Sequence, residues 1–181
     1  MLQQTQVKTV IPYFNNFVKE IPNLKSLSRS NEKKVLKLWE GLGYYNRARN
    51  LHKTSKILIK NYNGQIPQNF LELKKLPGVG DYTTNILLAL IYNQARVAID
   101  GNVRRVFLRL FNNEAKYPIH LFKTKRNGDL AEALIEFGAL ICKPVNPKCY
   151  ICKINKVCKY YKSTSKTEYK KKIKIQLKSY D

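Results

Sequence analysis

Acidic residues are scarce in this chain of 181 residues, where 12 Asp and Glu stand against 34 Lys and Arg and leave a formal net charge of +22. The excess is not confined to the C-terminal tail, because the residues before Lys159 still include 26 basic and 10 acidic side chains. A body of this charge attracts polyanions, and nucleic acid is the leading candidate. The alternative is a lysine-rich proteome that uses lysine on any solvated face.

Long apolar runs are lacking as well, and none approaches the ~20 residues that a membrane span needs. The first residues, Met1 to Gln6, do not form a signal peptide, because no basic region precedes an apolar run. Alternating strands and internal repeats are also missing. Because 44% of the residues are apolar, the chain can still bury a core. We therefore expect a cytoplasmic, all-α protein without a membrane span.

Most of the chain has the apolar spacing of helices. Three helix ends have clear signals: Ser30 as an N-cap, Asn63-Gly64 as a C-cap, and Asn69 as the N-cap of a short helix. The predicted helices cover about residues 7–18, 31–39, 45–62, 70–73, 82–92, 102–111 and 129–141. The predicted domains are a helical domain over residues 1–95, a domain that holds the cysteines over 96–160, and a Lys-rich linker or tail over 161–181.

All four cysteines lie within one stretch of 17 residues, with the spacing Cys-x6-Cys-x2-Cys-x5-Cys. Such clustering without a signal peptide indicates a metal centre rather than disulfides. Structural zinc prefers two short cysteine pairs separated by a longer loop, whereas only the central pair is short here. Four thiolates in one compact loop suit an iron–sulfur cubane, which the spacing alone favours only modestly over zinc. The predicted ligands are Cys142, Cys149, Cys152 and Cys158.

The run Leu76-Pro77-Gly78-Val79-Gly80 lies between two predicted helices. Its two glycines allow the backbone to approach a ligand closely. The amides after Gly78 begin the next helix, whose dipole favours an anion such as a DNA phosphate. The alternative is a plain helix–helix turn, because Pro-Gly is common between helices.

Asp100 stands directly before a predicted helix, in the run Ile99-Asp100-Gly101-Asn102-Val103. The simplest interpretation is an N-cap. A carboxylate at a basic DNA surface can also stabilise a cationic sugar in a transition state. Gly101 beside it leaves space for a substrate.

Taken together, five motifs in this order resemble the helix–hairpin–helix DNA glycosylases, most closely the adenine glycosylases of the MutY type. The resemblance extends from Met1 to about Tyr160 and implies an all-α helical barrel domain plus a helical iron–sulfur cluster domain. The motifs are Leu2-Gln3-Gln4-Thr5-Gln6, Gly41-Leu42-Gly43-Tyr44-Tyr45, Leu76-Pro77-Gly78-Val79-Gly80, Asp100-Gly101-Asn102-Val103 and the four cysteines.

The resemblance implies a role for each matching residue. Asp100 would stabilise the oxocarbenium-like sugar, with Asn102 supporting the site, and Gln4 and Tyr44 would enter the base stack so that the adenine leaves the duplex. Glu136 would contact the adenine pocket. The hairpin that holds a DNA phosphate would comprise Leu76, Gly78, Val79 and Gly80. The four cysteines would hold a 4Fe–4S cluster that does not perform the hydrolysis.

Tyr82 separates two branches of these enzymes, because the endonuclease III type has a lysine at this position that forms a Schiff base and cuts the strand. Tyrosine cannot do so. The implied reaction is hydrolytic removal of adenine paired with guanine or 8-oxoguanine in double-stranded DNA, leaving an abasic site. The alternatives are an endonuclease III-like glycosylase/lyase and a non-catalytic, metal-stabilised DNA-binding module.

In the adenine glycosylases of the MutY type, the general acid is a glutamate, and the resemblance would place it two residues before Met1. Their N-terminal helices and their separate 8-oxoguanine recognition domain also have no counterpart within residues 1–181. The sequence therefore predicts a fragment, truncated at both ends, that is weakly active or inactive by itself. We further expect a monomer that associates with the nucleoid in the cytoplasm.

Overall fold

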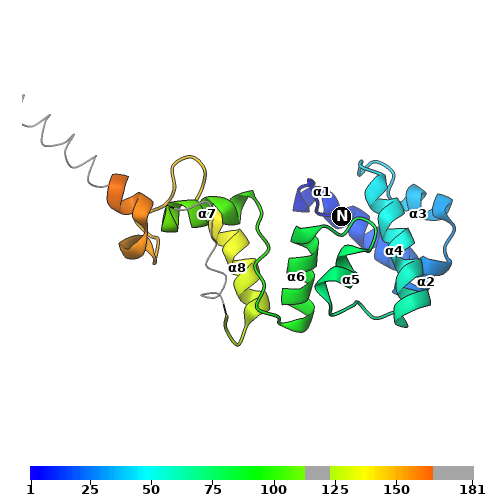
Figure 1. Ribbon diagram of the computed structural model, residues 1–181. Coiled ribbons are helices and arrows are strands. Elements are labelled where there is room, and N and C mark those ends of the chain that lie inside the picture. Colours follow the sequence, from blue (N-terminus) through cyan, green and yellow to red (C-terminus); the bar gives the residue numbers. More distant parts are fainter. Residues whose placement is uncertain (113–122, 165–181) are drawn as a thin grey trace, which may run out of the picture. The chain divides into compact units, whose positions relative to one another are not determined.

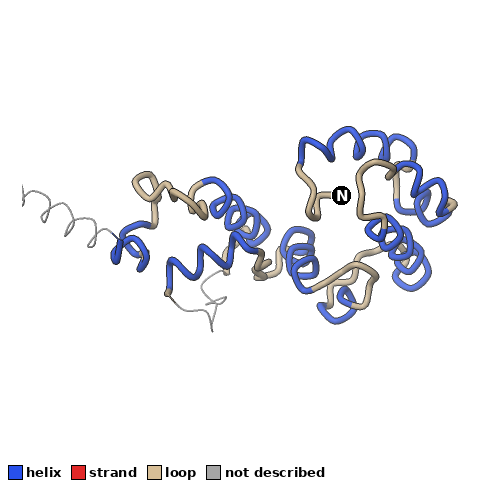
Figure 2. The backbone as a smooth tube through the Cα atoms, turned by 90° about the horizontal axis from the view of Figure 1, so that it is seen from above, coloured by secondary structure: helices blue, strands red, loops and turns tan. Residues whose placement is uncertain are grey.

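A computed structural model describes residues 1–112 and 123–164 of the chain. Within these ranges the backbone forms helices, turns and loops and no strand, so the predicted all-α class is confirmed (Figure 1, Figure 2). No helix in the described ranges is long and apolar enough to cross a membrane. The helices are α1 (Val7–Glu20), α2 (Leu24–Arg29), α3 (Glu32–Leu38), α4 (Asn46–Tyr62), α5 (Phe70–Lys74), α6 (Asp81–Tyr92), α7 (Gly101–Phe111), α8 (Asn127–Leu140) and the short 3-10 helix η2 (Asn155–Val157).

The chain divides into two compact units, unit 1 over Met1–Thr84 and unit 2 over Asn85–Asp181. The division falls within α6, whereas the domain boundary predicted from the sequence near residue 95 stays a prediction. Residues 165–181 of the predicted tail lie outside the described residues. Each unit has its own buried apolar cluster, so each is described by itself.

The core of unit 1 is centred on Trp39, whose side chain is almost completely buried. Phe17 from α1 meets the Trp39 ring edge-on, with 6.1 Å between the ring centroids. Val35 of α3 and Ala48 of α4 belong to the same buried cluster. α4 packs against both α2 and α3, which makes it the central helix of this unit.

Asparagines begin and end several helices of unit 1. α4 ends at Asn63, which adopts the left-handed conformation with φ 50°, as the sequence predicted. Asn69 accepts hydrogen bonds from the amides of Leu71 and Glu72 and caps α5, also as predicted. The predicted N-cap Ser30 is wrong, because the side chain of Asn31 caps α3 and the Ser30 hydroxyl donates back into α2.

Helix α2 was not predicted from the sequence. It has six residues and begins with a capping box, in which the Asn23 side chain accepts from the Ser26 amide and the Ser26 hydroxyl oxygen accepts from the Asn23 amide. Leu27 is its buried residue. So short a helix depends on packing against α4 more than on its own apolar periodicity.

In unit 2, helices α7 and α8 pack side by side (Figure 1). The buried side chains of α7 are Val103, Val106 and Phe107, which form one apolar cluster with Leu134 of α8. Gly138 allows the helices to approach closely, because a Cβ atom there would lie 2.6 Å from the Cβ atom of Asn102. The start of α7, which holds the predicted catalytic carboxylate, is therefore pressed against α8.

Candidate functional site

The turn between α5 and α6 forms the predicted hairpin in unit 1. The Val79 amide donates to the Leu76 carbonyl at 3.1 Å, and Gly78 has φ 76°, a conformation that glycine adopts without steric cost. A Cβ atom at Gly78 would lie 2.9 Å from the Cβ atom of Asn50 on α4. Glycine is therefore required at this position both for the turn and for the close approach to α4.

α4 and α5 hold this hairpin in place. The Thr54 hydroxyl of α4 donates to the Pro77 carbonyl at 3.1 Å. Lys74, at the end of α5, forms an exposed ion pair of 2.7 Å with Asp81, the first residue of α6. The first-turn amides of α6 lie after Gly80, in the position where a helix N-terminus binds anions.

Three separate segments of unit 1 meet around one open pocket. Gln4 comes from the first loop, Tyr44 from the loop before α4, and Gly78, Gly80 and Tyr82 from the hairpin and the start of α6. The structure thus brings together five of the residues predicted from the sequence. Within residues 1–112 and 123–164, no lysine lines this pocket.

Gln4 and Tyr44 share an uncommon backbone conformation, with φ 55° and φ 50° respectively. The other non-glycine residues with positive φ in the described ranges are asparagines, which tolerate this conformation. For other residues the left-handed region costs about 1–2 kcal/mol. The two residues expected to enter DNA are therefore held in a conformation that the rest of unit 1 must stabilise.

Leu76 and Val79, also predicted in the hairpin, do not line this pocket. The Leu76 side chain is 5% exposed and packs in the interior, so only its backbone can serve the hairpin surface. Val79 is partly exposed at the turn.

Asp100 caps α7 in unit 2. One carboxylate oxygen accepts the Val103 amide at 2.8 Å, and the other accepts the Asn102 side-chain amide at 3.0 Å. The N-cap interpretation is therefore correct, and the second oxygen is oriented by Asn102. This arrangement fixes the direction of the carboxylate, which electrostatic stabilisation of a cation requires.

A chain of hydrogen bonds continues from Asp100 toward the cysteines. Arg105 donates to the Asn102 side-chain oxygen at 2.8 Å and to the Gly138 carbonyl at 2.6 Å. It also donates to the Cys142 carbonyl at 2.8 Å. Arg105 thus links the predicted catalytic end of α7 with the first predicted metal ligand.

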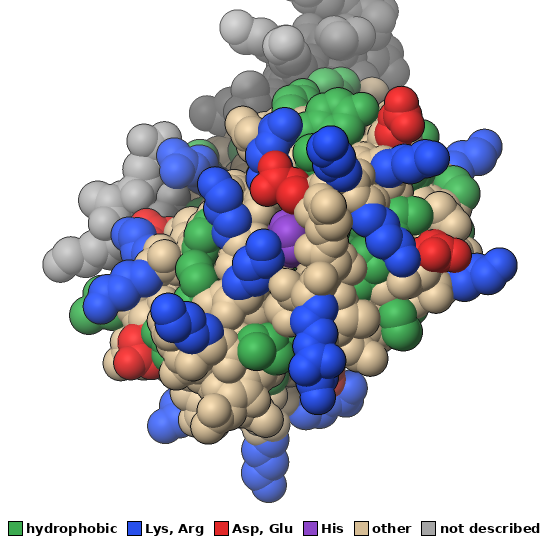
Figure 3. Space-filling model, turned by 90° about the vertical axis from the view of Figure 1, so that its right-hand side faces the viewer, with side chains coloured by type: hydrophobic (Ala, Val, Ile, Leu, Met, Phe, Trp, Pro, Cys, Tyr) green, Lys and Arg blue, Asp and Glu red, His purple; other side chains and the backbone are tan. Residues whose placement is uncertain are grey.

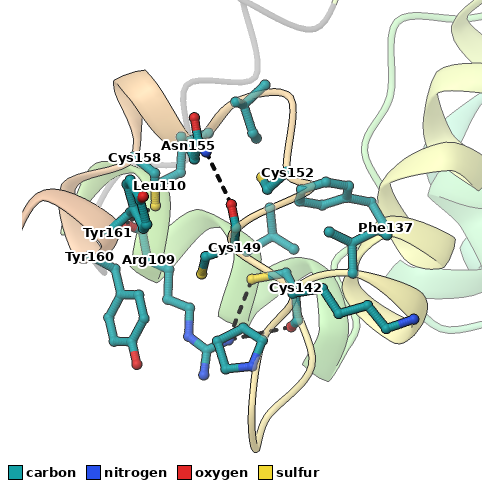
Figure 4. A pocket seen from close by; sticks show the side chains of 15 residues that line it. Arg109, Leu110, Phe137, Cys142, Cys149, Cys152, Asn155, Cys158, Tyr160 and Tyr161 are labelled. Atoms are coloured by element: carbon teal, nitrogen blue, oxygen red, sulfur yellow. Dashed lines mark hydrogen bonds between the residues drawn. The ribbon is translucent and has the colours of Figure 1, made fainter. Parts of the chain in front are cut away.

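The four cysteines surround one pocket in unit 2, which apolar side chains such as Phe137 and Ile154 also line (Figure 4). Burial raises the pKa of the Cys149 thiol, and the neighbouring Cys142, Cys152 and Cys158 raise it further, which reflects how close the four groups lie. Four soft sulfur donors around an apolar hollow suit an iron–sulfur cluster.

The described cysteine side chains do not converge on a single point. Across residues 1–112 and 123–164, no three His, Cys, Asp or Glu side chains are grouped so that they could hold one ion. A single zinc ion needs its donors within about 2.0–2.3 Å of one point. Each cysteine of a cubane binds its own iron, so the sulfurs lie farther apart.

Arg109 of α7 organises the loop that leads from Cys142. It donates to the Lys143 carbonyl at 2.6 Å and to the Pro144 carbonyl at 2.9 Å, and it reaches the Cys142 sulfur at 3.4 Å. Its guanidinium also lies 4.8 Å from the centroid of the Tyr160 ring.

Glu136 lies on α8, where it is exposed. It lines neither the pocket of unit 1 nor the cysteine pocket. Its predicted contact with an adenine pocket stays a prediction.

Three arginines that organise these sites were not predicted from the sequence. Arg105 and Arg109 share one face of α7 with Asn102, and this spacing along a helix could have revealed them. Arg47 lies in the first turn of α4, three residues after Tyr44, but its hydrogen bonds join segments that are distant in the sequence.

Lys and Arg side chains spread over the face of the molecule shown in Figure 3, with few acidic ones among them. The ion pairs of the described residues, such as Lys34–Glu20 and Arg49–Glu32 at 3.5 Å each, are exposed and contribute little stability. The positive charge therefore remains available to a polyanion.

The pattern described as "HhH-GPD superfamily base excision DNA repair protein" matches residues 1–128, which is more than half of the chain. The chain belongs to the HhH-GPD superfamily. The matched range includes the hairpin, both loops of the unit 1 pocket, and Asp100.

Within the HhH-GPD superfamily, the chain is similar to adenine DNA glycosylases. That of Buchnera aphidicola subsp. Baizongia pistaciae is 44% identical over 171 residues, covering 89% of this chain and 49% of the relative. The human adenine DNA glycosylase is 34% identical over 172 residues, covering 88% of this chain and 32% of the relative. The resemblance noted from the motifs is thereby confirmed. The chain spans about half the length of the first bacterial relatives that it matches.

Solved structures of related enzymes have the same fold. A thermostable thymine-DNA glycosylase matches with a TM-score of 0.80 at 27% identity, covering 90% of this chain and 80% of the other. An endonuclease III trapped in a covalent intermediate with DNA matches with a TM-score of 0.72 at 25% identity, covering 91% and 81%.

Proposed function

We infer that this chain provides the catalytic portion of an adenine DNA glycosylase. The enzyme binds double-stranded DNA and hydrolyses the N-glycosidic bond of adenine paired with guanine or 8-oxoguanine. Water adds to C1′ of the sugar, the adenine leaves with the electron pair of the broken bond, and an abasic site remains. The protein acts as a monomer on the nucleoid, inside the cell.

The observation that supports this function best is the pocket of unit 1. It gathers Gln4, Tyr44 and the hairpin glycines Gly78 and Gly80 from three segments of the chain. A hairpin that binds a phosphate, next to side chains that enter the base stack, is what an enzyme needs to extrude a base.

Asp100 supplies the charge that stabilises the sugar cation as the adenine departs. Asn102 orients one of its oxygens, so the carboxylate is preorganised before the reaction. The departing adenine also needs a proton from a general acid.

Hydrolysis is favoured over strand cleavage by Tyr82, which lines the pocket where a lyase would place its lysine. No lysine in the described part of the chain lines this pocket, which supports the same choice. A covalent adduct trapped with borohydride would instead establish the glycosylase/lyase alternative.

The four cysteines hold a 4Fe–4S cluster in this proposal. The cluster supplies structural support and, through its loop, basic groups near DNA, but it does not perform the hydrolysis. Iron and sulfide analysis with a visible absorbance spectrum tests this assignment. A colourless protein loaded with zinc would overturn it and favour the metal-stabilised binding module.

The test of the function compares the protein with its Asp100→Asn variant. Asparagine caps helices as well as aspartate does, so the variant keeps α7 but loses the charge. With protein in excess over a duplex containing adenine opposite 8-oxoguanine, we expect excision by the variant to fall by ~10²–10³-fold. Binding to the same duplex should persist.

Two results would contradict the proposal. Equal excision by both proteins would leave Asp100 as an N-cap alone. If the unaltered protein releases no adenine and binds neither the mispaired duplex nor a matched adenine–thymine duplex, the function itself is wrong.

A further inference from the structure

Arg47 lies in the first turn of α4, directly behind the loop that presents Tyr44. Its side chain is partly buried and lines the pocket of unit 1. Neither the motifs nor the proposed function gives it a role. It nevertheless donates hydrogen bonds to two loops of that pocket and lies over two aromatic rings.

One terminal nitrogen of Arg47 binds the loop that holds Gln4. This nitrogen donates to the Met1 carbonyl at 2.6 Å, to the Gln3 carbonyl at 2.5 Å and to the Thr5 hydroxyl at 3.1 Å. These acceptors lie on both sides of Gln4, whose own backbone has the left-handed conformation. The guanidinium therefore holds the two ends of this strained bend together.

The other terminal nitrogen binds the loop that holds Tyr44. It donates to the Gly43 carbonyl at 3.1 Å and approaches the Leu42 carbonyl at 3.4 Å. The Gly43 carbonyl also accepts the indole N–H of Trp39 at 3.1 Å. The residue just before Tyr44 is thus fixed from two directions.

The guanidinium of Arg47 lies over two aromatic rings. Its central carbon lies 5.2 Å from the Tyr44 ring centroid and 5.6 Å from the Trp39 ring centroid. Through Trp39, the arginine is anchored in the core of unit 1. Its Nε atom is buried and has no hydrogen-bond partner. The side chain therefore adopts a position that satisfies the two loops while one of its own donors stays unpaired.

We propose that Arg47 is the positioning residue that joins the Gln4 loop to the Tyr44 loop, so that both side chains enter the DNA as one unit when the adenine is extruded. Lysine cannot replace it, because an ammonium group lacks the planar fork that reaches both loops and the flat face that stacks on Tyr44. This inference rests on the proposed function, and it adds a residue that need not touch DNA.

The test uses Arg47→Lys, which preserves the charge. The first readout is hydrogen exchange of the backbone amides in residues 1–6 and 42–46 of the free protein. The second is the fluorescence of 2-aminopurine placed opposite 8-oxoguanine in a duplex. This adenine analogue becomes brighter when it leaves the base stack. We expect faster exchange in both loops together. Base extrusion and excision should fall on the order of 10²-fold, because misplaced groups lose that much, while affinity for undamaged duplex stays within about twofold.

Arg29→Lys is the matched control, because Arg29 is an exposed arginine at the end of α2 in the same unit. It should change neither readout. If Arg47→Lys extrudes 2-aminopurine like the unaltered protein, or loosens neither loop, the positioning role is overturned although the proposed function stands. If the unaltered protein itself never extrudes the analogue, the proposed function fails, and the role of Arg47 in extrusion fails with it.

Discussion

The pocket of unit 1 and the cysteine pocket of unit 2 are built in similar ways for different tasks. In each, one arginine on a helix donates hydrogen bonds to backbone carbonyls of a loop and lies over a tyrosine ring: Arg47 with Tyr44, and Arg109 with Tyr160. The pocket of unit 1 is open and has strained backbone at Gln4 and Tyr44. The cysteine pocket is lined by thiols and apolar groups.

The two pockets differ in which groups hold their loops in place. In unit 2 the loop has four thiol groups that the proposed cluster would hold together, so the arginine would share this task with the cofactor. In unit 1, among the residues that the structure describes, protein side chains alone hold the loops of the pocket in place. Arg47 should therefore matter in the free protein, whereas Arg109 should matter most when the cluster is absent or being lost.

The largest expected effect comes from removing a cluster ligand. Cys152→Ser should abolish the visible absorbance of the cluster and destabilise unit 2 by more than about 4 kcal/mol, because loss of a bound metal is among the most damaging changes. Hydrogen exchange should rise in α7 and α8 but not in α1 to α4. Equal loosening of both units would show that the cluster supports the whole chain, and apoprotein made by chelation is the control.

A smaller effect is expected for Arg109→Lys, the counterpart of the variant at Arg47. Charged hydrogen bonds contribute about 1.5–3 kcal/mol each, and lysine should retain part of this. With the cluster bound we expect near-normal stability, but release of iron to a chelator should become several times faster. Unchanged release would mean that Arg109 does not hold the loop and that the two arginines are not equivalent.

The smallest effect is expected for Trp39→Phe in unit 1. The ring contact with Phe17 persists, but the hydrogen bond to the Gly43 carbonyl is lost, which should cost about 1 kcal/mol. The Gly43 carbonyl still accepts from Arg47, so no acceptor is left unsatisfied. Thermal unfolding measures this loss, and combining the change with Arg47→Lys should cost more than the sum of both, because they share one acceptor.

Local signals were readable from the sequence, whereas contacts between distant segments were not. The caps at Asn63 and Asn69 depend on neighbouring residues alone and were predicted correctly. Ser30 and Asn31 are both good caps, and only packing decides between them. The spacing of the cysteines predicted that they would lie around one site, as they do. The role of Arg47 could not be foreseen, because it depends on loops more than 40 residues apart in the sequence.

The left-handed conformation of Gln4 and Tyr44 has a consequence for protein engineering. Glycine or asparagine at either position would relieve up to about 1 kcal/mol of strain. A library selected only for survival at high temperature should therefore accumulate such replacements early. The selected proteins would be more stable to heat, and only an assay of base excision would reveal that they had lost activity.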